Sequence, residues 1–268
     1  MIYWECRSIL AQGIAKLILA RVPLLNVAAT DPVNAMLDEF LVLVQATYHA
    51  FILARTSHEL GASVVDALAD DVLVTGSVGL NIAIEPIPVS QLRKFKATYP
   101  DFVVDIFHGK LVQHWQDLLD GIFAHYVDLH VANARPFVEL GNTQVKVDFA
   151  NAVPIQVQLR ESLCHHFQFR KYAERQKLVA KVRDAASEAR TEADTIHRHV
   201  HFRNAIQHHQ GVLREFVFKE LGRQDLTVLD DSGATQSLMA GHKIVLSVPE
   251  FDDFRRALLV VTQRWKSP

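Results

Sequence analysis

The chain has 268 residues, 49% of them hydrophobic, and a formal net charge of −2 at pH 7. This size allows one large domain or two small ones with a sizeable core. The near-neutral charge excludes the global basic field of a protein that coats DNA, and no low-complexity segment or solenoid repeat occurs. Cys6 and Cys164 fit neither a zinc spacing nor a disulfide framework, so we expect two buried thiols.

The apolar stretch at residues 9–29 predicts a helix that packs on the body of the protein. Lys16, Arg21 and Pro23 interrupt it, and it lacks a basic flank followed by a clean apolar run. We therefore expect neither a membrane span nor a targeting signal, and a cytoplasmic location.

A long helix is predicted next. Asp31-Pro32 has the pattern of an N-cap followed by proline at the first helical position, and the helix is expected to reach about Leu60. Valines, glycines and prolines at 71–90 favour short strands or an irregular connection. The predicted buried face of the helix, at three- and four-residue spacing, comprises Met36, Leu37, Phe40, Leu41, Val44 and Tyr48.

More helices are predicted in the middle of the chain. Residues 101–133 form one, with a buried face of Phe107, Leu111, Trp115, Leu118, Leu119, Ile122 and Tyr126. Residues 157–195 alternate Lys/Arg with Glu/Asp, which indicates a long, largely solvated helix. A last core helix is expected to reach Leu221, where Gly222 caps it.

The C-terminal tail changes to a period of two. Residues 226–229 and 243–246 flank Asp230-Asp231-Ser232-Gly233, which predicts a β-hairpin or two short strands, and Pro249-Glu250 opens a closing amphipathic helix. The sequence thus predicts a mainly α-helical bundle with a small β-hairpin appendage near the C-terminus. We expect a helical region at 1–90, the bundle at 91–222, and a hairpin plus helix packed on it at 223–268.

Residues 203–211 read Arg-Asn-Ala-Ile-Gln-His-His-Gln-Gly and are the most informative stretch of the chain. Arg203 supplies a permanent planar cation for a phosphate, His208 a proton acceptor and donor near neutral pH, and Asn204 an adaptable amide. The segment resembles the R-x4-H motif of the HEPN superfamily, in the form with a polar residue directly after the arginine. Gly211 also lies shortly after His208, where that family often has a glycine.

The resemblance implies an up-and-down helical bundle and a metal-independent endoribonuclease of the kind that serves as a toxin or phage-defence effector. His208 would act as general base or acid on the ribose 2′-OH and the leaving 5′-oxygen. Arg203 would stabilise the charge on the phosphorane, and Asn204 would orient the phosphate or the arginine. Cleavage would leave a 2′,3′-cyclic phosphate, with RNA as partner and neither cofactor nor metal required.

A second Arg-x4-His pair runs from Arg160 to His165, and the composition makes about one such pair expected by chance. Asn204 favours the first pair, because Glu161 would put a carboxylate beside the phosphate. Local charge agrees: residues 170–214 hold ten Lys/Arg, five Asp/Glu and five His, which makes a basic stripe suited to a phosphate backbone. The alternative is a solvated helix face with ordinary ion pairs. The substrate-binding residues expected beside the motif are Arg198, His201 and His209.

Spacing adds a prediction about assembly. Five residues along an α-helix turn through about 500°, so Arg203 and His208 would point about 140° apart. A two-fold homodimer lets the motifs of two copies line one cleft, and HEPN domains usually pair in this way. An antitoxin or another regulatory partner fits the same resemblance.

Two other functions remain open. A non-catalytic HEPN-like module would bind RNA, a nucleotide or a protein partner without turnover. His197 and His201 form an i, i+4 pair that could hold a metal, but no carboxylate pattern completes a catalytic set, and we expect no metal. The histidines at 197, 199 and 201 would then add positive potential or pack at the dimer interface. No P-loop, Rossmann fingerprint or nucleophile elbow occurs.

Overall fold

The computed structural model describes residues 31–266 except 76, 79–81, 84 and 184–189. Cys6 and the helix expected at 9–29 lie outside the described residues. By its internal contacts the chain divides into Met1–Pro32 and Val33–Pro268, and the second unit holds the helical bundle.

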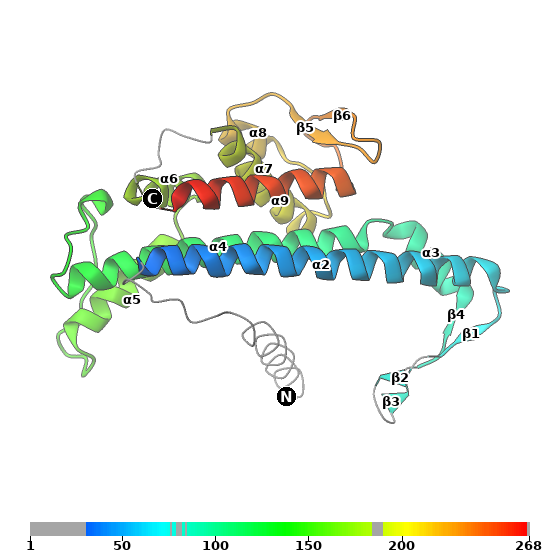
Figure 1. The fold of residues 1–268 in the computed structure, drawn as a ribbon, viewed down its shortest axis with the longest axis horizontal. Helices are drawn as coiled ribbons and strands as arrows, with labels where there is room; N and C mark the ends of the chain where they lie inside the picture. The colour runs from blue at the N-terminus through cyan, green and yellow to red at the C-terminus, as the bar shows by residue number, and fades with distance from the viewer. Residues whose placement is uncertain (1–30, 76, 79–81, 84, 184–189, 267–268) are drawn as a thin grey trace, which may run out of the picture. The chain divides into compact units, whose positions relative to one another are not determined.

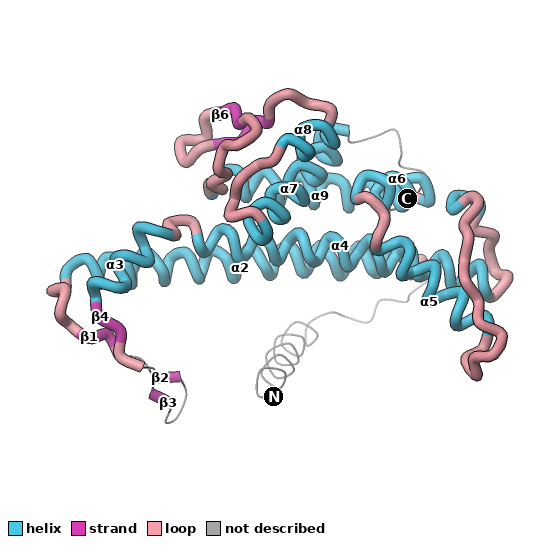
Figure 2. The backbone as a smooth tube through the Cα atoms, turned by 180° about the vertical axis from the view of Figure 1, so that it is seen from behind, coloured by secondary structure: helices cyan, strands magenta, loops and turns pink. Residues whose placement is uncertain are grey.

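This unit is a mainly helical bundle of two layers. Helices α2 (Pro32–Ala67) and α4 (Phe102–Val131) lie side by side in one layer (Figure 1). Helices α6 (Tyr172–Val182), α7 (Arg190–His208) and α9 (Val248–Trp265) form the other, as the view from behind also shows (Figure 2). The mainly α-helical fold class is therefore confirmed.

The remaining elements lie between these helices along the chain. They are β1 (Leu73–Val74), β2 (Ser77–Val78), β3 (Ile82–Ala83), β4 (Ile87–Pro88), α3 (Val89–Thr98), η1 (Val138–Leu140), α5 (Ile155–Gln168), α8 (Glu215–Leu221), β5 (Leu226–Leu229) and β6 (Thr235–Leu238). Strands β1 and β4 pair antiparallel, as do β2 and β3, which confirms the short strands expected at 71–90. Gly222 has φ +64° and ends α8, as predicted.

Helix α2 confirms the predicted long helix and extends it to Ala67. Its buried residues alternate three- and four-residue steps, as in a coiled-coil seam, and are Val33, Leu37, Phe40, Val44, Thr47 and Phe51. The ring of Phe51 lies 4.5 Å from that of Phe251 in α9, so α2 belongs to the common core. Among the described residues, α2 alone is long and apolar enough to cross a membrane.

Trp115 joins the two layers at the centre of α4. Its ring centroid lies 5.7 Å from that of Phe40 and 5.0 Å from that of Trp265, and its Nε1 donates to the hydroxyl of Tyr172 at 2.8 Å. Trp115 and Tyr126 are both buried, which confirms their interpretation as packing residues.

The prediction of a single solvated helix at 157–195 is wrong. The chain forms α5 and α6 there, with an extended backbone at Lys171 between them (ψ 142°), and then begins α7 at Arg190. These helices are not solvated, because their apolar residues enter the shared core. The residues concerned are Leu163, Phe167, Leu178, Val179, Ile196 and Val200.

The hairpin exists, but its second strand was placed wrongly. Strand β5 pairs with β6, with Leu226 opposite Leu238, and Asp230 closes the turn by accepting from the backbone N–H groups of Ser232 and Ala234. The apolar segment 243–246 instead packs Ile244 and Leu246 into the core. Its apolar character reflects burial, and its backbone bridges Val212 at Lys243 instead of pairing with β5.

One core runs from α2 through α9. The compact unit therefore begins at Val33, and the boundary expected at residue 90 falls inside it. The segment expected to pack on the bundle, 223–268, supplies Phe251 and Phe254 to the same core.

Candidate functional site

Arg203 lies on α7 at the edge of the buried face. It is half-buried, and its Nη1 donates to the side-chain oxygen of Asn204 at 3.1 Å. Its Nε is buried without a hydrogen-bond partner. No carboxylate of the described residues lies within ion-pair distance, so the guanidinium retains donors for an anion.

His208 is the last residue of α7 and is exposed. Since α7 is continuous from Arg203 to His208, the two side chains leave the helix about 140° apart and about 7.5 Å apart along its axis. One chain therefore does not aim both groups at one phosphate.

The turn after the motif is fixed to a distant segment. The N–H of Gly211 donates to the carbonyl of Ala205 at 2.9 Å, and the N–H of Ile244 donates to the carbonyl of Gly211 at 2.8 Å. This pairing brings exposed Lys243 and His242 beside the motif. The sequence did not indicate these two residues, because the pairing joins positions about thirty residues apart.

Gly211 should be the least replaceable residue of this turn. Its φ is +80°, and a Cβ would lie 3.3 Å from Lys243 Cγ and 3.4 Å from the carbonyl oxygen of Ile244. We expect Gly211→Ala to lower the free energy of unfolding by about 2 kcal/mol. The control Gly222→Ala has a similar φ (+64°) with nothing within 4 Å and should cost about 1 kcal/mol. Urea unfolding compares them; equal losses would exclude a role for the 243–244 contact.

A buried polar chain lies beneath the motif. His108 Nε2 lies 3.0 Å from His199 Nδ1, and His199 Nε2 lies 3.0 Å from Glu250 Oε1. Glu250 also binds Arg198 Nη2 at 2.9 Å and accepts from the N–H of Leu229 at 2.7 Å. This chain connects α4, α7, α9 and β5.

Burial sets the protonation of this chain. Burial, with help from His199 and Arg203, holds the pKa of His108 well below its usual 6.5. Burial also lowers the pKa of His199, although Glu250 opposes it. For Glu250, burial raises the pKa, but His199, Arg198 and the N–H of Leu229 outweigh it and hold the pKa below its usual range. The network is thus neutral at both histidines and charged at Glu250 and Arg198.

The protein should therefore lose stability in mild acid. The folded-state pKa values of His108 and His199 lie below the unfolded value of 6.5, so their stabilisation is complete above pH 6.5 and is lost as pH falls below it. Asp105 acts in the opposite sense, because burial and Asp101 raise its pKa to about 6, and burial also raises the pKa values of Asp101 and Asp120. Burial lowers the pKa values of His114, His197 and His201 as well, so five imidazoles oppose these three carboxyls. We expect a lower urea midpoint at pH 5.5 than at pH 7.5. Equal midpoints would contradict this, and exposed His165→Gln should leave the difference unchanged.

The three residues expected to bind substrate lie in different places. Arg198 is held by Glu250, and His201 is 6% exposed and faces His197. Neither is open to RNA, because these inward contacts occupy them. His209 is half-buried beside the motif, with its ring 6.3 Å from that of Phe216.

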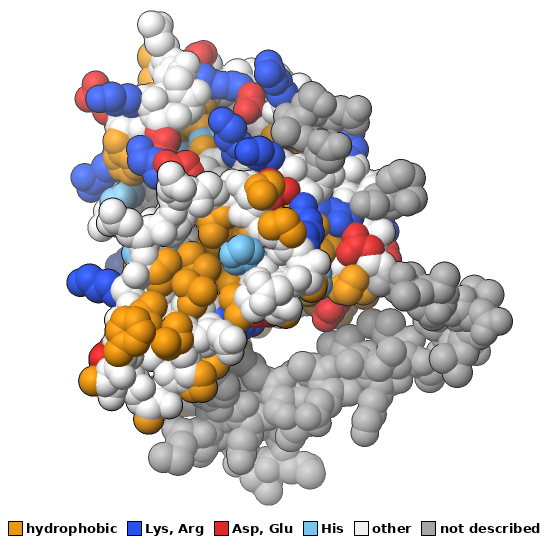
Figure 3. Space-filling model, turned by 90° about the vertical axis from the view of Figure 1, so that its left-hand side faces the viewer, with side chains coloured by type: hydrophobic (Ala, Val, Ile, Leu, Met, Phe, Trp, Pro, Cys, Tyr) orange, Lys and Arg blue, Asp and Glu red, His pale blue; other side chains and the backbone are white. Residues whose placement is uncertain are grey.

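Only some of the Lys and Arg side chains in the basic stripe lie at the surface. Arg175 is buried and bound to Asp120, and Arg183 donates to the carbonyl of Trp265 at 2.9 Å. At the end of the unit that contains α5, exposed Lys and Arg side chains lie over the upper layer with Asp and Glu side chains among them, while hydrophobic side chains gather below (Figure 3). The exposed cations of 170–214 are Lys171, Lys177, Lys181, Arg190 and Arg214.

A second histidine cluster lies two turns before the end of α7. His197 Nε2 and His201 Nε2 are 3.2 Å apart, and Glu220 Oε2 of α8 lies 4.0 Å from His201 Nε2. Ligand atoms of all three lie within 4.8 Å of one another. Burial, with help from His201, lowers the pKa of His197 to about 4, so this ring is neutral at pH 7. Glu220 supplies the carboxylate that the sequence pattern did not place here.

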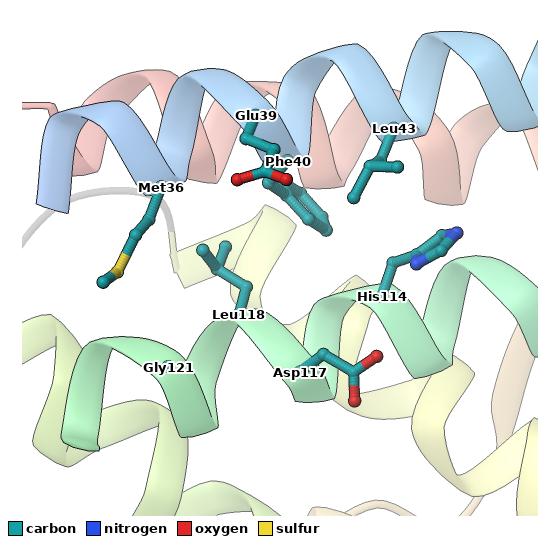
Figure 4. Close-up of a pocket in the computed structure, with 8 residues that line it drawn as sticks. All are labelled: Met36, Glu39, Phe40, Leu43, His114, Asp117, Leu118 and Gly121. Carbon is teal, nitrogen blue, oxygen red and sulfur yellow. The ribbon is translucent and has the colours of Figure 1, made fainter. Parts of the chain in front are cut away.

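A shallow pocket lies elsewhere, between α2 and α4 (Figure 4). Phe40 and Leu118 lie at its apolar part, and Glu39, His114 and Asp117 provide its charged and polar groups. No residue of the motif lines it, so it does not enlarge the candidate site.

The second Arg-x4-His pair differs from the first in its bonding. Both ends of the Arg160 guanidinium bind the Asp128 carboxylate, with Nη2 3.1 Å from Oδ2. That arginine is already neutralised by a carboxylate, whereas Arg203 is not. The pair Arg160 and His165 is therefore a matched control for Arg203 and His208.

A scan against protein-family models gives no match, and neither curated proteins nor solved structures give one.

Proposed function

We propose that the protein is a metal-independent endoribonuclease of HEPN type that acts as a homodimer. The observation that carries the proposal is the half-buried guanidinium of Arg203, held by Asn204 and free of any carboxylate of the described residues. A guanidinium that is held in place but not paired with a carboxylate can donate two parallel hydrogen bonds to the oxygens of one phosphate.

The proposed chemistry needs a proton-transfer group and a cation at one phosphate. A ribose 2′-oxygen attacks phosphorus as its proton passes to His208, the P–O5′ bond breaks, and the imidazolium so formed returns the proton to the leaving 5′-oxygen. Arg203 stabilises the negative charge that builds on the phosphorane. One copy of the chain supplies the arginine and the other the histidine, and the exposed position of His208 leaves it accessible to a second protomer.

Neighbouring groups support RNA binding. Exposed Lys243 and His242 lie beside the turn at Gly211, and exposed lysines lie on α6. A role as toxin or phage-defence effector, an antitoxin partner and a cytoplasmic location are consistent with this proposal.

The test is RNA cleavage by untagged full-length protein in EDTA. The proposal predicts fragments ending in a 2′,3′-cyclic phosphate. Binding of RNA without cleavage would overturn it in favour of a non-catalytic module, and cleavage only after Mg²⁺ is added would overturn its mechanism.

A further inference from the structure

We propose that His197, His201 and Glu220 bind a divalent metal ion, zinc, that connects α7 to α8. The metal is separate from the proposed ribonuclease chemistry, and it constrains the segment between the two helices while water or an anion fills its fourth position.

The spacing of the donor atoms fits zinc. Two nitrogens bound to Zn²⁺ at 2.0–2.1 Å with a tetrahedral angle lie about 3.3 Å apart, and the two Nε2 atoms lie 3.2 Å apart. Glu220 Oε2, at 4.0 Å from His201 Nε2, has to approach that atom by roughly 0.7 Å to reach that spacing, and it also has to close on His197, from which it lies within 4.8 Å. Its side chain is 26% exposed, so a rotation can supply this movement.

The ligand types agree with the spacing. The i, i+4 separation on α7 puts both imidazoles on one helix face, and two imidazoles with one carboxylate are a common zinc set that leaves a fourth position open. Glu220 also lines an open hollow with Lys171, Glu174, Phe216 and Lys219, so water or an anion can reach that position.

The position of the ligands indicates what the metal does. His201 and Glu220 flank, in the sequence, the segment that contains His208, His209 and the turn at Gly211. A metal joining the two ends of this segment constrains it in the folded protein and therefore stabilises the motif turn.

The experiment adds ZnCl₂ to untagged full-length protein stripped with EDTA and dialysed free of chelator. Calorimetric titration should give one site per chain, and the melting temperature should rise with zinc concentration. The variants His201→Gln and Glu220→Gln should each weaken binding by more than about tenfold. Glu220→Gln is near the surface and isosteric, so it tests the site without removing a buried ring.

The control replaces His165 and His166, which are adjacent and exposed on α5, by glutamine and should bind zinc as the unchanged protein does. Absence of one-site binding, or equal binding by Glu220→Gln and the unchanged protein, would overturn the proposal. RNA cleavage in EDTA is a separate readout, so either proposal can fail without the other.

Discussion

Replacing Glu250 by alanine should lower the free energy of unfolding by about 3–5 kcal/mol at pH 7. Glu250 is fully buried and accepts from Arg198 and from the N–H of Leu229, with His199 at 3.0 Å. Its removal leaves a nearly buried guanidinium with only the Asp253 carboxylate at 3.9 Å, and that carboxylate is 40% exposed. The buried donors that Glu250 had paired have no water to replace the lost acceptor. The loss should appear in guanidinium chloride unfolding as a lower midpoint.

The matched control is Asp252→Ala on the same helix. Asp252 pairs with Arg255 and Arg256, but its side chain is 30% exposed, so its loss should cost at most about 1 kcal/mol. Glu250→Gln keeps an acceptor for Leu229 and should fall between the two. If Glu250→Ala and Asp252→Ala lower the unfolding midpoint equally, the buried polar network of His108, His199 and Glu250 does not contribute to stability as the structure indicates.

The second large effect concerns catalysis. Arg203→Ala and His208→Ala should each lower the rate of RNA cleavage by about 100-fold or more, because one removes the cation for the phosphorane and the other the proton-transfer group. Arg203→Lys should recover only part of the loss, since an ammonium cannot bind two phosphate oxygens side by side.

Arg160→Ala and His165→Ala are the controls for these variants. They have the same spacing, but Arg160 is bound to Asp128. Their cleavage rates should stay within about twofold of the unchanged protein. A similar loss in both pairs would show that neither pair is a specific site.

The sequence predicted the helices whose apolar residues form one regular stripe. Helices α2, α4 and α9 each bury such a stripe, and the three-and-four spacing located them, together with the proline signals at Pro32 and Pro249. The sequence-based prediction failed at α6 and α7. Buried Arg175 and His199 occupy core positions there, but in the sequence they look like solvated residues. It also failed at β6, whose Thr-Gln-Ser-Leu has little apolar signal.

The motif itself was visible in the sequence, but its surroundings were not. The proximity of Lys243 to Gly211, of Glu220 to His201 and of Glu250 to His199 depends on packing between separate elements. No local pattern encodes such distances. For the same reason Arg198 and His201 were expected at the RNA surface, although each contacts a group on another helix.

Arg203 of one copy and His208 of another are expected to act on one phosphate. The most direct test co-expresses Arg203→Ala and His208→Ala chains with different tags and purifies dimers through both. Each variant alone should be inactive in EDTA, whereas the mixed dimer retains one intact site of two and should cleave RNA at about half the rate of the unchanged dimer. A mixed dimer no more active than its parents, or failure to isolate any dual-tagged dimer, would contradict a shared site.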